Sequence, residues 1–186
     1  PNTPANYGGN PNIRVNNIYE AFEPCDPRLE YSILEPGDEI NGLTYAASWS
    51  RTGYSIQKFL IPENQLTGAA NSPLNIPLIR FADVLLMKAE ALVRLGRAVE
   101  AQPLVDAVRL RAGVDPLTTA PTLEDIYLER SLELNWEGHR RQDMIRFGTF
   151  LEPNKFRGAS PDFRTLFPIP TGALDANPNL VQNPGY

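Results

Sequence analysis

The sequence predicts a mainly α-helical protein of tetratricopeptide-like helical hairpins, with a loop-rich N-terminal segment, small β-hairpins and an extended Pro-rich C-terminal tail. Apolar residues recur at helical spacing in the middle of the chain, single glycines separate the helical stretches, and prolines recur near the C-terminal end. We therefore expect one structural unit with three parts, which are residues 1–75, 76–150 and 151–186.

The N-terminal part is rich in proline, glycine and asparagine, residues that favour turns. The pairs Pro36-Gly37 and Asn41-Gly42 separate short apolar runs that are typical of strands. We expect loops with one or two small hairpins. The extended candidates are residues 29–34, 43–49 and 55–61.

Residues 78–95 are predicted to form a buried helix, which Pro77 suits as a first turn and Gly96 ends. Its apolar stripe comprises Leu78, Phe81, Ala82, Leu85, Leu86, Ala89, Leu92 and Val93. A second helix over residues 97–112, ending at Gly113, would turn back on the first, because a one-glycine turn between helices makes an antiparallel hairpin. Its inward residues are Val99, Leu104, Val105 and Val108.

A third helix is expected over residues 123–137. Thr122 and Asp125 have the spacing of a capping box, with Asp in place of the usual Glu or Gln. Gly138 interrupts this helix, and a short fourth helix over residues 139–147 follows. Small residues allow close helix approach, so the helix pairs resemble tetratricopeptide hairpins.

The tail is predicted to run extended over a folded body, because its prolines cannot continue a helix or sit inside a sheet. Its apolar side chains recur among turn formers, which indicates anchoring rather than disorder. We expect Phe167, Ile169 and Tyr186 to be buried against the helices.

Composition and single residues exclude several classes of site. The net charge of -5 argues against nucleic acid, because phosphate binding needs clustered Lys and Arg and here the basic residues alternate with acidic ones. Cys25 is the only cysteine and His139 the only histidine, so the sequence has no internal disulfide, cysteine zinc site or two-histidine zinc site.

A stretch near the C-terminus imitates the opening of a calcium loop. Asp175, Asn177 and Asn179 have the right spacing, but Leu180 and Tyr186 occupy the positions that need Gly and Glu. We therefore expect no metal and no cofactor.

Several spaced motifs together resemble the C-terminal part of SusD/RagB-type outer-membrane nutrient-binding proteins. They occur in the order typical of that family and cover most of the chain. The motifs are residues 79–91, 108–113, 129–134, 137–141 and 143–148, the run Pro168-Ile169-Pro170, and the ending Gln182-Asn183-Pro184-Gly185-Tyr186; upstream, residues 26–29 and 52–54 with Lys58 resemble the family's middle segment.

This resemblance implies a lipoprotein on the extracellular face of the outer membrane of a Gram-negative bacterium. Such a protein captures glycan for a SusC-like TonB-dependent transporter, and its mostly helical fold contains tetratricopeptide-like hairpins. Family members are typically more than twice this length, so membrane contact would come only through a lipidated cysteine in a preceding part. Cys25 does not fit that role, because Phe22-Glu23-Pro24 is not the small, apolar lipobox that processing requires.

Three glutamates, Glu129, Glu133 and Glu137, lie at successive i,i+4 positions and would stack on one helix face. A glycosidase needs two carboxylates that face a sugar from opposite sides, which neighbours on one face do not provide. We expect instead an ion-pair network that clamps the third and fourth helices. Its predicted members are these three glutamates with Arg80, Arg130, Arg140 and Asp143, with Arg141 as a further cation.

The ligand-binding candidates are aromatic. Trp49 lies between Tyr45 and Tyr54 in a turn-rich segment, which favours exposure of a ring on which a sugar can stack. The alternative is that these residues form the packed face of a hairpin. We expect Trp136 to be core or interhelical, and we expect Phe81, Phe147 and Phe150 to pack inside.

The leading hypothesis is non-catalytic binding of an oligosaccharide for import by a partner transporter. The alternative is a helical-repeat module that binds peptide, which the predicted hairpins would also suit. The third is a glycoside hydrolase that uses acidic residues between 129 and 143.

Overall fold

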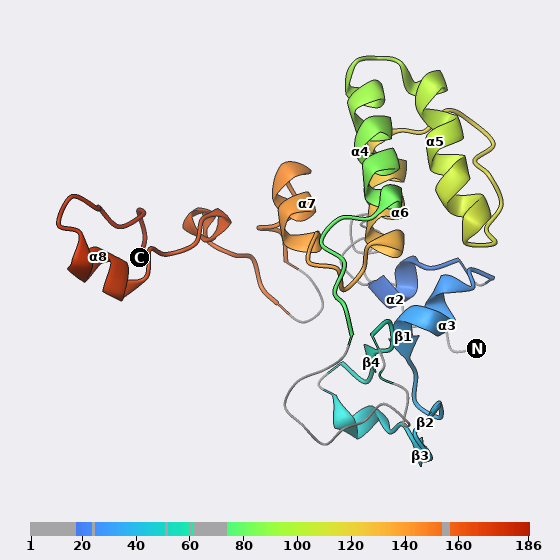
Figure 1. The fold of residues 1–186 in the computed structure, drawn as a ribbon, viewed down its shortest axis with the longest axis horizontal. Coiled ribbons are helices and arrows are strands. Elements are labelled where there is room, and N and C mark those ends of the chain that lie inside the picture. Colours follow the sequence, from blue (N-terminus) through green and yellow to red (C-terminus); the bar gives the residue numbers. More distant parts are fainter. Residues whose placement is uncertain (1–17, 24, 51, 60, 62–73, 154–156) are drawn as a thin grey trace. The chain divides into compact units, whose positions relative to one another are not determined.

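The computed structural model describes residues 18–23, 25–50, 52–59, 61, 74–153 and 157–186 (Figure 1). The chain is mainly helical, as predicted, and forms two compact units that divide between Arg140 and Arg141. The predicted division into three parts of one structural unit stays a prediction. None of the helices in the described ranges has the length and apolar content that a membrane span requires.

A helical hairpin forms the main core of the first unit. Helices α4 (Phe81–Arg94) and α5 (Ala98–Arg111) lie side by side, and helix α6 (Leu123–Glu133) packs against both (Figure 1). Gly96, with φ +75°, allows the sharp turn between α4 and α5, and the Arg97 amide donates back to the Leu92 carbonyl at 2.8 Å. The core residues are Ala82, Leu86, Ala89, Leu92, Ala101, Val105, Val108 and Ile126.

The four predicted helices are present, but each is shorter than predicted. Arg80 is extended, so α4 begins at Phe81. The predicted burial of Leu78 and Phe81 is wrong: Leu78 precedes the helix, where helical spacing does not apply, and Phe81 is an exposed residue at its start. Val99 is also exposed, since it lies in the first turn of α5 on the side away from the core. The fourth helix is α7 (Arg140–Arg146).

The third helix ends at Glu133 rather than at residue 137. The Asn135 side chain donates to the Leu132 carbonyl at 2.7 Å and satisfies one acceptor of the last turn. Trp136 then adopts a left-handed conformation, with φ +61°, and its side chain is exposed. The predicted core position of Trp136 is therefore wrong.

The segment before the hairpin contains short elements (Figure 1). They are α2 (Ile18–Ala21), α3 (Arg28–Ser32), β1 (Ile33–Leu34), β2 (Glu39–Ile40), β3 (Leu43–Thr44), the 3-10 helix η1 (Ala47–Trp49) and β4 (Ser55–Ile56). Strands β2 and β3 form an antiparallel hairpin whose turn, Asn41 and Gly42, has two positive φ angles. Strand β1 pairs antiparallel with β4.

The predicted strand over residues 29–34 is mostly wrong, because α3 occupies all but its last two residues. Asp26 stabilises the turn just before this helix, whose N-cap is Pro27: its carboxylate accepts from the Arg28 amide at 2.9 Å, and its carbonyl accepts from the Leu29 amide at 3.1 Å. The other two extended candidates shrink to β3 and β4. A second apolar cluster joins this segment to α6 and contains Ala21, Phe22, Ile33 and Leu132.

The second unit contains a tail whose side chains bond its own backbone. Gln182 accepts from the Ile169 amide at 2.8 Å and donates to the Ile169 carbonyl at 2.9 Å, and the Tyr186 hydroxyl donates to the Leu166 carbonyl at 2.8 Å. The Tyr186 ring meets Phe163 edge-on with centroids 4.9 Å apart. Its described helical elements after α7 are η3 (Asp162–Thr165) and α8 (Thr171–Ala176).

Glycine is required at position 185, because a Cβ there would lie 2.5 Å from Cγ of Phe163. The side chains of Phe167 and Tyr186 are exposed, and Ile169 is half-buried. Packing of the tail on the helical hairpins stays a prediction.

The capping box predicted from the sequence is present at the start of α6, and its contribution to stability can be measured. Thr122 Oγ1 accepts from the Asp125 amide at 3.2 Å, and the Asp125 carboxylate accepts from the Thr122 amide at 2.8 Å. We predict that Thr122→Ala lowers the free energy of unfolding by about 1 kcal/mol, measured by urea denaturation. Thr119→Ala, the same change at an exposed loop position, is the control; an equal loss in both variants would contradict the assignment.

Candidate functional site

The three glutamates predicted to stack along the third helix are buried and paired with cations, but the predicted position of Glu137 on the helix is wrong, because α6 ends at Glu133 and Glu137 lies in the turn after it. Together Glu129, Glu133 and Glu137 are called the carboxylate row here. Glu129 accepts from Arg28 at 2.5 Å and from Arg109 at 3.2 Å. The first cation comes from α3 and the second from α5, so this one carboxylate joins two distant segments to α6.

The other two glutamates share cations with each other. Glu133 accepts from Arg80 at 2.9 Å, from Arg111 at 2.7 Å and, more weakly, from Arg28 at 3.5 Å. Glu137 accepts from Arg80 at 2.7 Å and from Lys58 at 2.5 Å. Because Arg80 spans both carboxylates, the stretch just before α4 is fixed to the end of α6.

The pKa values of this cluster follow from burial and pairing. Burial acts to raise the pKa of Glu137, but hydrogen bonds from Arg80 and Lys58 outweigh it and hold the pKa below its ordinary value. Burial lowers the pKa of Lys58, because removal of water from the ammonium group outweighs its contacts with Glu137.

The remaining predicted members of the network have other contacts. Arg130 pairs with Asp83 of α4 at 2.8 Å, and Arg140 donates to Ser131 and lies over the Tyr127 ring, 4.5 Å from its centroid. Asp143 pairs with Arg146 at 2.7 Å. Among the predicted cations, Arg80 forms ion pairs with two members of the row, and Arg141 donates to the carbonyls of Arg164 and Thr165.

Sequence reasoning missed four cations that contact the row. They are Arg28, Lys58, Arg109 and Arg111. The pair Arg28 and Glu129 is separated by 101 residues, so no local spacing connects the two side chains. The available signal was indirect: three stacked glutamates on a buried helix require several cations from elsewhere.

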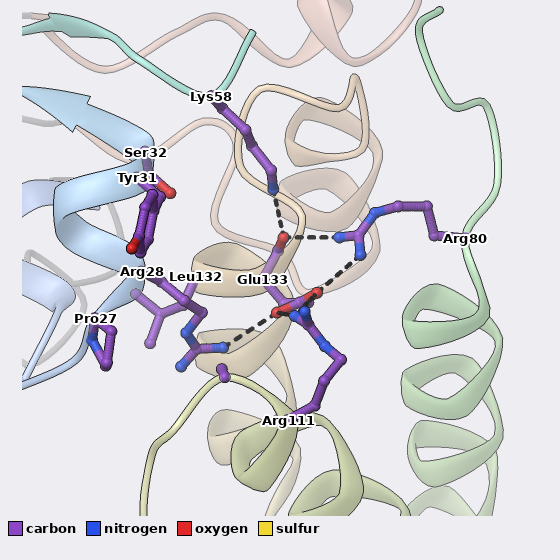
Figure 2. Close-up of a pocket in the computed structure, with 10 residues that line it drawn as sticks. Pro27, Arg28, Tyr31, Ser32, Lys58, Arg80, Arg111, Leu132 and Glu133 are labelled. Carbon is purple, nitrogen blue, oxygen red and sulfur yellow. Dashed lines mark hydrogen bonds and ion pairs between the residues drawn. The ribbon is translucent and has the colours of Figure 1, made fainter.

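A pocket of about 340 Å³ opens beside Glu133 (Figure 2). Its lining carries four cationic side chains and one carboxylate. The cations are Arg28, Lys58, Arg80 and Arg111, and Tyr31 and Leu132 contribute to the wall. Within the described ranges, no group of three His, Cys, Asp or Glu side chains is arranged to hold a metal ion.

The predicted aromatic candidates divide into two arrangements. Tyr45 is buried and meets Trp49 edge-on, with centroids 5.6 Å apart and an interplanar angle of 85°. Trp49, at the end of η1, is 55% exposed, so a large part of its indole is open to solvent. Tyr54 instead stacks on Tyr19 at 4.2 Å and packs against the second apolar cluster.

Fold and geometry together define a tetratricopeptide-like helical scaffold that carries a loop with an exposed aromatic side chain. The chain belongs to the SusD family, because that family's model matches residues 6–186.

Relatives and solved structures agree with this membership. The chain is 31% identical over 159 residues to the starch-binding protein SusD of Bacteroides thetaiotaomicron. This alignment covers 80% of this chain and 28% of that protein. It is 38% identical over 125 residues to SusD-like protein P38 of Formosa agariphila, covering 60% and 25%. The chain thus spans about a quarter of the length of these curated relatives.

Two solved structures share most of the chain's fold. A surface glycan-binding protein A from Bacteroides uniformis has a TM-score of 0.75 and 27% identity, covering 90% of this chain and 39% of that one. A laminarin-binding SusD-like protein has a TM-score of 0.72 and 36% identity, covering 91% and 37%.

The pairing of Glu137 predicts a pH effect on stability. Because its pKa is lower in the folded than in the unfolded chain, Glu137 contributes stability above its ordinary pKa of about 4.5, and this contribution is lost as the pH falls below that value. We predict that the free energy of unfolding, measured by urea denaturation, falls less between pH 6 and pH 3 in Glu137→Gln than in the parent chain.

Asp115→Asn is the matched control, since Asp115 is exposed and its change also replaces a carboxylate by an amide. If the parent chain and Glu137→Gln lose the same free energy on acidification, the pairing does not stabilise the fold in the way that we describe.

Proposed function

We propose that the chain is the C-terminal part of a non-catalytic, cell-surface glycan-binding protein and that Trp49 contacts the glycan. The observation that carries the proposal is an exposed indole, braced by a buried tyrosine, on a member of the SusD family. Two similar proteins, a starch-binding protein and a laminarin-binding protein, support glycan as the ligand class.

The geometry of Trp49 suits a sugar platform. The C–H face of a pyranose packs well on an exposed aromatic face, and a ring that is already held in place loses little entropy on binding. Tyr45 supplies that support through its edge-on contact. Tyr54 has its ring face stacked on Tyr19, so we assign it to packing rather than to the ligand.

Family membership also supports the biological context of the proposal. The bound oligosaccharide would be passed to a SusC-like TonB-dependent transporter at the extracellular face of the outer membrane of a Gram-negative bacterium. The loop with Trp49 would hold the glycan, and the helical hairpin would supply the scaffold.

The acidic residues favour binding over hydrolysis. A glycosidase needs one carboxyl group with a raised pKa and a second that faces the sugar across the scissile bond. Each member of the carboxylate row is engaged by at least two cations, and the pKa of Glu137 is lowered rather than raised. The row therefore supports a structural role.

The two tryptophans make the proposal testable by fluorescence. Trp49 and Trp136 are the only tryptophans in the sequence and are 55% and 51% exposed, so each is a matched control for the other. In a Trp136→Phe background, titration with maltoheptaose and with laminarin oligosaccharides should change the Trp49 emission in a saturable way for at least one sugar. Calorimetry of Trp49→Ala with that sugar should show at least about a tenfold loss of affinity, as for removal of a stacking aromatic contact.

Unchanged affinity in Trp49→Ala would remove Trp49 from the site. Lack of binding to every glycan tested, in a chain with native far-ultraviolet circular dichroism, would overturn the proposed function.

A further inference from the structure

We propose that the pocket beside Glu133 binds an acidic substituent of the glycan, a carboxylate or a sulfate ester, with Arg111 as the main contact. This inference rests on the proposed function, because it names the class of glycan that the chain would select. The site is separate from the Trp49 platform, since none of the residues that line it belongs to the aromatic pair of Tyr45 and Trp49.

The charges around the pocket are unequally distributed. Four cations line it, but Glu133 is the one carboxylate among the residues that do so. The other acidic partners of those cations, Asp26, Glu129 and Glu137, are buried and do not line the cavity. A ligand in the pocket would therefore lie closer to the cationic groups than to the buried carboxylates that balance them. Because Coulomb energies are largest at short distances, this local positive charge would outweigh the chain's net charge of -5.

Arg111 has hydrogen-bonding capacity that the fold does not use. Its Nη2 donates to both oxygens of Glu133, at 2.7 and 2.9 Å. Its Nε and Nη1 have no partner among the described residues, and its side chain is 60% exposed. These N–H groups are available to an oxyanion, and hydrogen bonds between two charged partners are stronger than neutral ones.

The fold does not require Arg111 for charge balance. Glu133 already accepts from Arg80 and Arg28, whose side chains are far less exposed. An ion pair made by a mostly exposed arginine contributes little to stability. A third cation on one carboxylate is therefore better explained by a ligand than by the stability of the fold.

The wall of the pocket suits a sugar that carries the charge. Tyr31 is exposed and lies on the same side of the cavity as Arg28, and Leu132 adds apolar surface beside them (Figure 2). An aromatic ring next to a cation can contact a sugar C–H face while the cation binds its acidic group. A cavity of about 340 Å³ falls in the size range of small-ligand sites.

The test compares acidic and neutral trisaccharides of similar size, together with inorganic sulfate. Calorimetry would measure binding of trigalacturonate, its neutral reduced counterpart trigalactose, a sulfated trigalactose, and inorganic sulfate alone, each at 50 and 300 mM NaCl. We expect at least one acidic trisaccharide to bind about tenfold more tightly than the neutral one, as for one hydrogen bond between charged partners. High salt should reduce this preference.

Variants separate binding from folding. Arg111→Gln should abolish the preference for acidic sugars while leaving the urea midpoint of unfolding close to that of the parent chain. Arg97→Gln is the matched control, because Arg97 is 53% exposed and pairs with Glu100 at 2.6 Å, outside the pocket. It should keep the preference.

Equal affinity for acidic and neutral sugars would overturn this inference and leave the proposed function standing if the neutral sugars bind. An undiminished preference in Arg111→Gln would also overturn it, and so would binding of inorganic sulfate without binding of either acidic trisaccharide. Absence of binding to any sugar, acidic or neutral, would overturn both proposals.

Discussion

Buried ion pairs along helix α6 and the turn that follows it are the interaction on which the arrangement of the first unit depends. The carboxylate row receives cations from α3, from the turn after β4, from the stretch before α4 and from α5. Removing these charges from water is costly, and each carboxylate repays that cost only when its cations are in place. The segments are therefore fixed together, because each carboxylate is the shared acceptor of cations from different segments.

This arrangement also positions the functional candidates. Lys58 donates to the Glu133 carbonyl at 2.6 Å and pairs with Glu137, which holds the chain just after β4 against α6. Strand β4 pairs with β1, which follows the helix that carries Arg28. The loop with Trp49 lies between β3 and β4, so its C-terminal end is anchored by the same ions that line the pocket with Arg111. A rigid attachment of this kind is what a binding loop needs.

Local patterns in the sequence predicted local structure well. The apolar period predicted the helices of the hairpin, the spacing of Thr122 and Asp125 predicted a capping box, and Asn41-Gly42 predicted a tight hairpin turn.

Local patterns failed where a tertiary contact determines the structure. The run after Pro27 resembles a strand, but Asp26 and the buried pairing of Arg28 favour a helix there. The partners of the carboxylate row could not be predicted, because no short-range spacing links side chains that are distant in sequence. Exposure of Trp49 followed from its turn-rich context, whereas the support from Tyr45 required the structure.

A double-mutant cycle on Arg28 and Glu129 tests whether the carboxylate row holds these distant segments together. The pair is buried, 2.5 Å apart and separated by 101 residues, so it reports on tertiary structure alone. Urea unfolding of Arg28→Met, Glu129→Gln and the double variant should show that the double loses less free energy than the sum of the singles, with a coupling of about 1 to 3 kcal/mol. Losses that add within about 0.5 kcal/mol would contradict it, because the two side chains would then stabilise the fold independently.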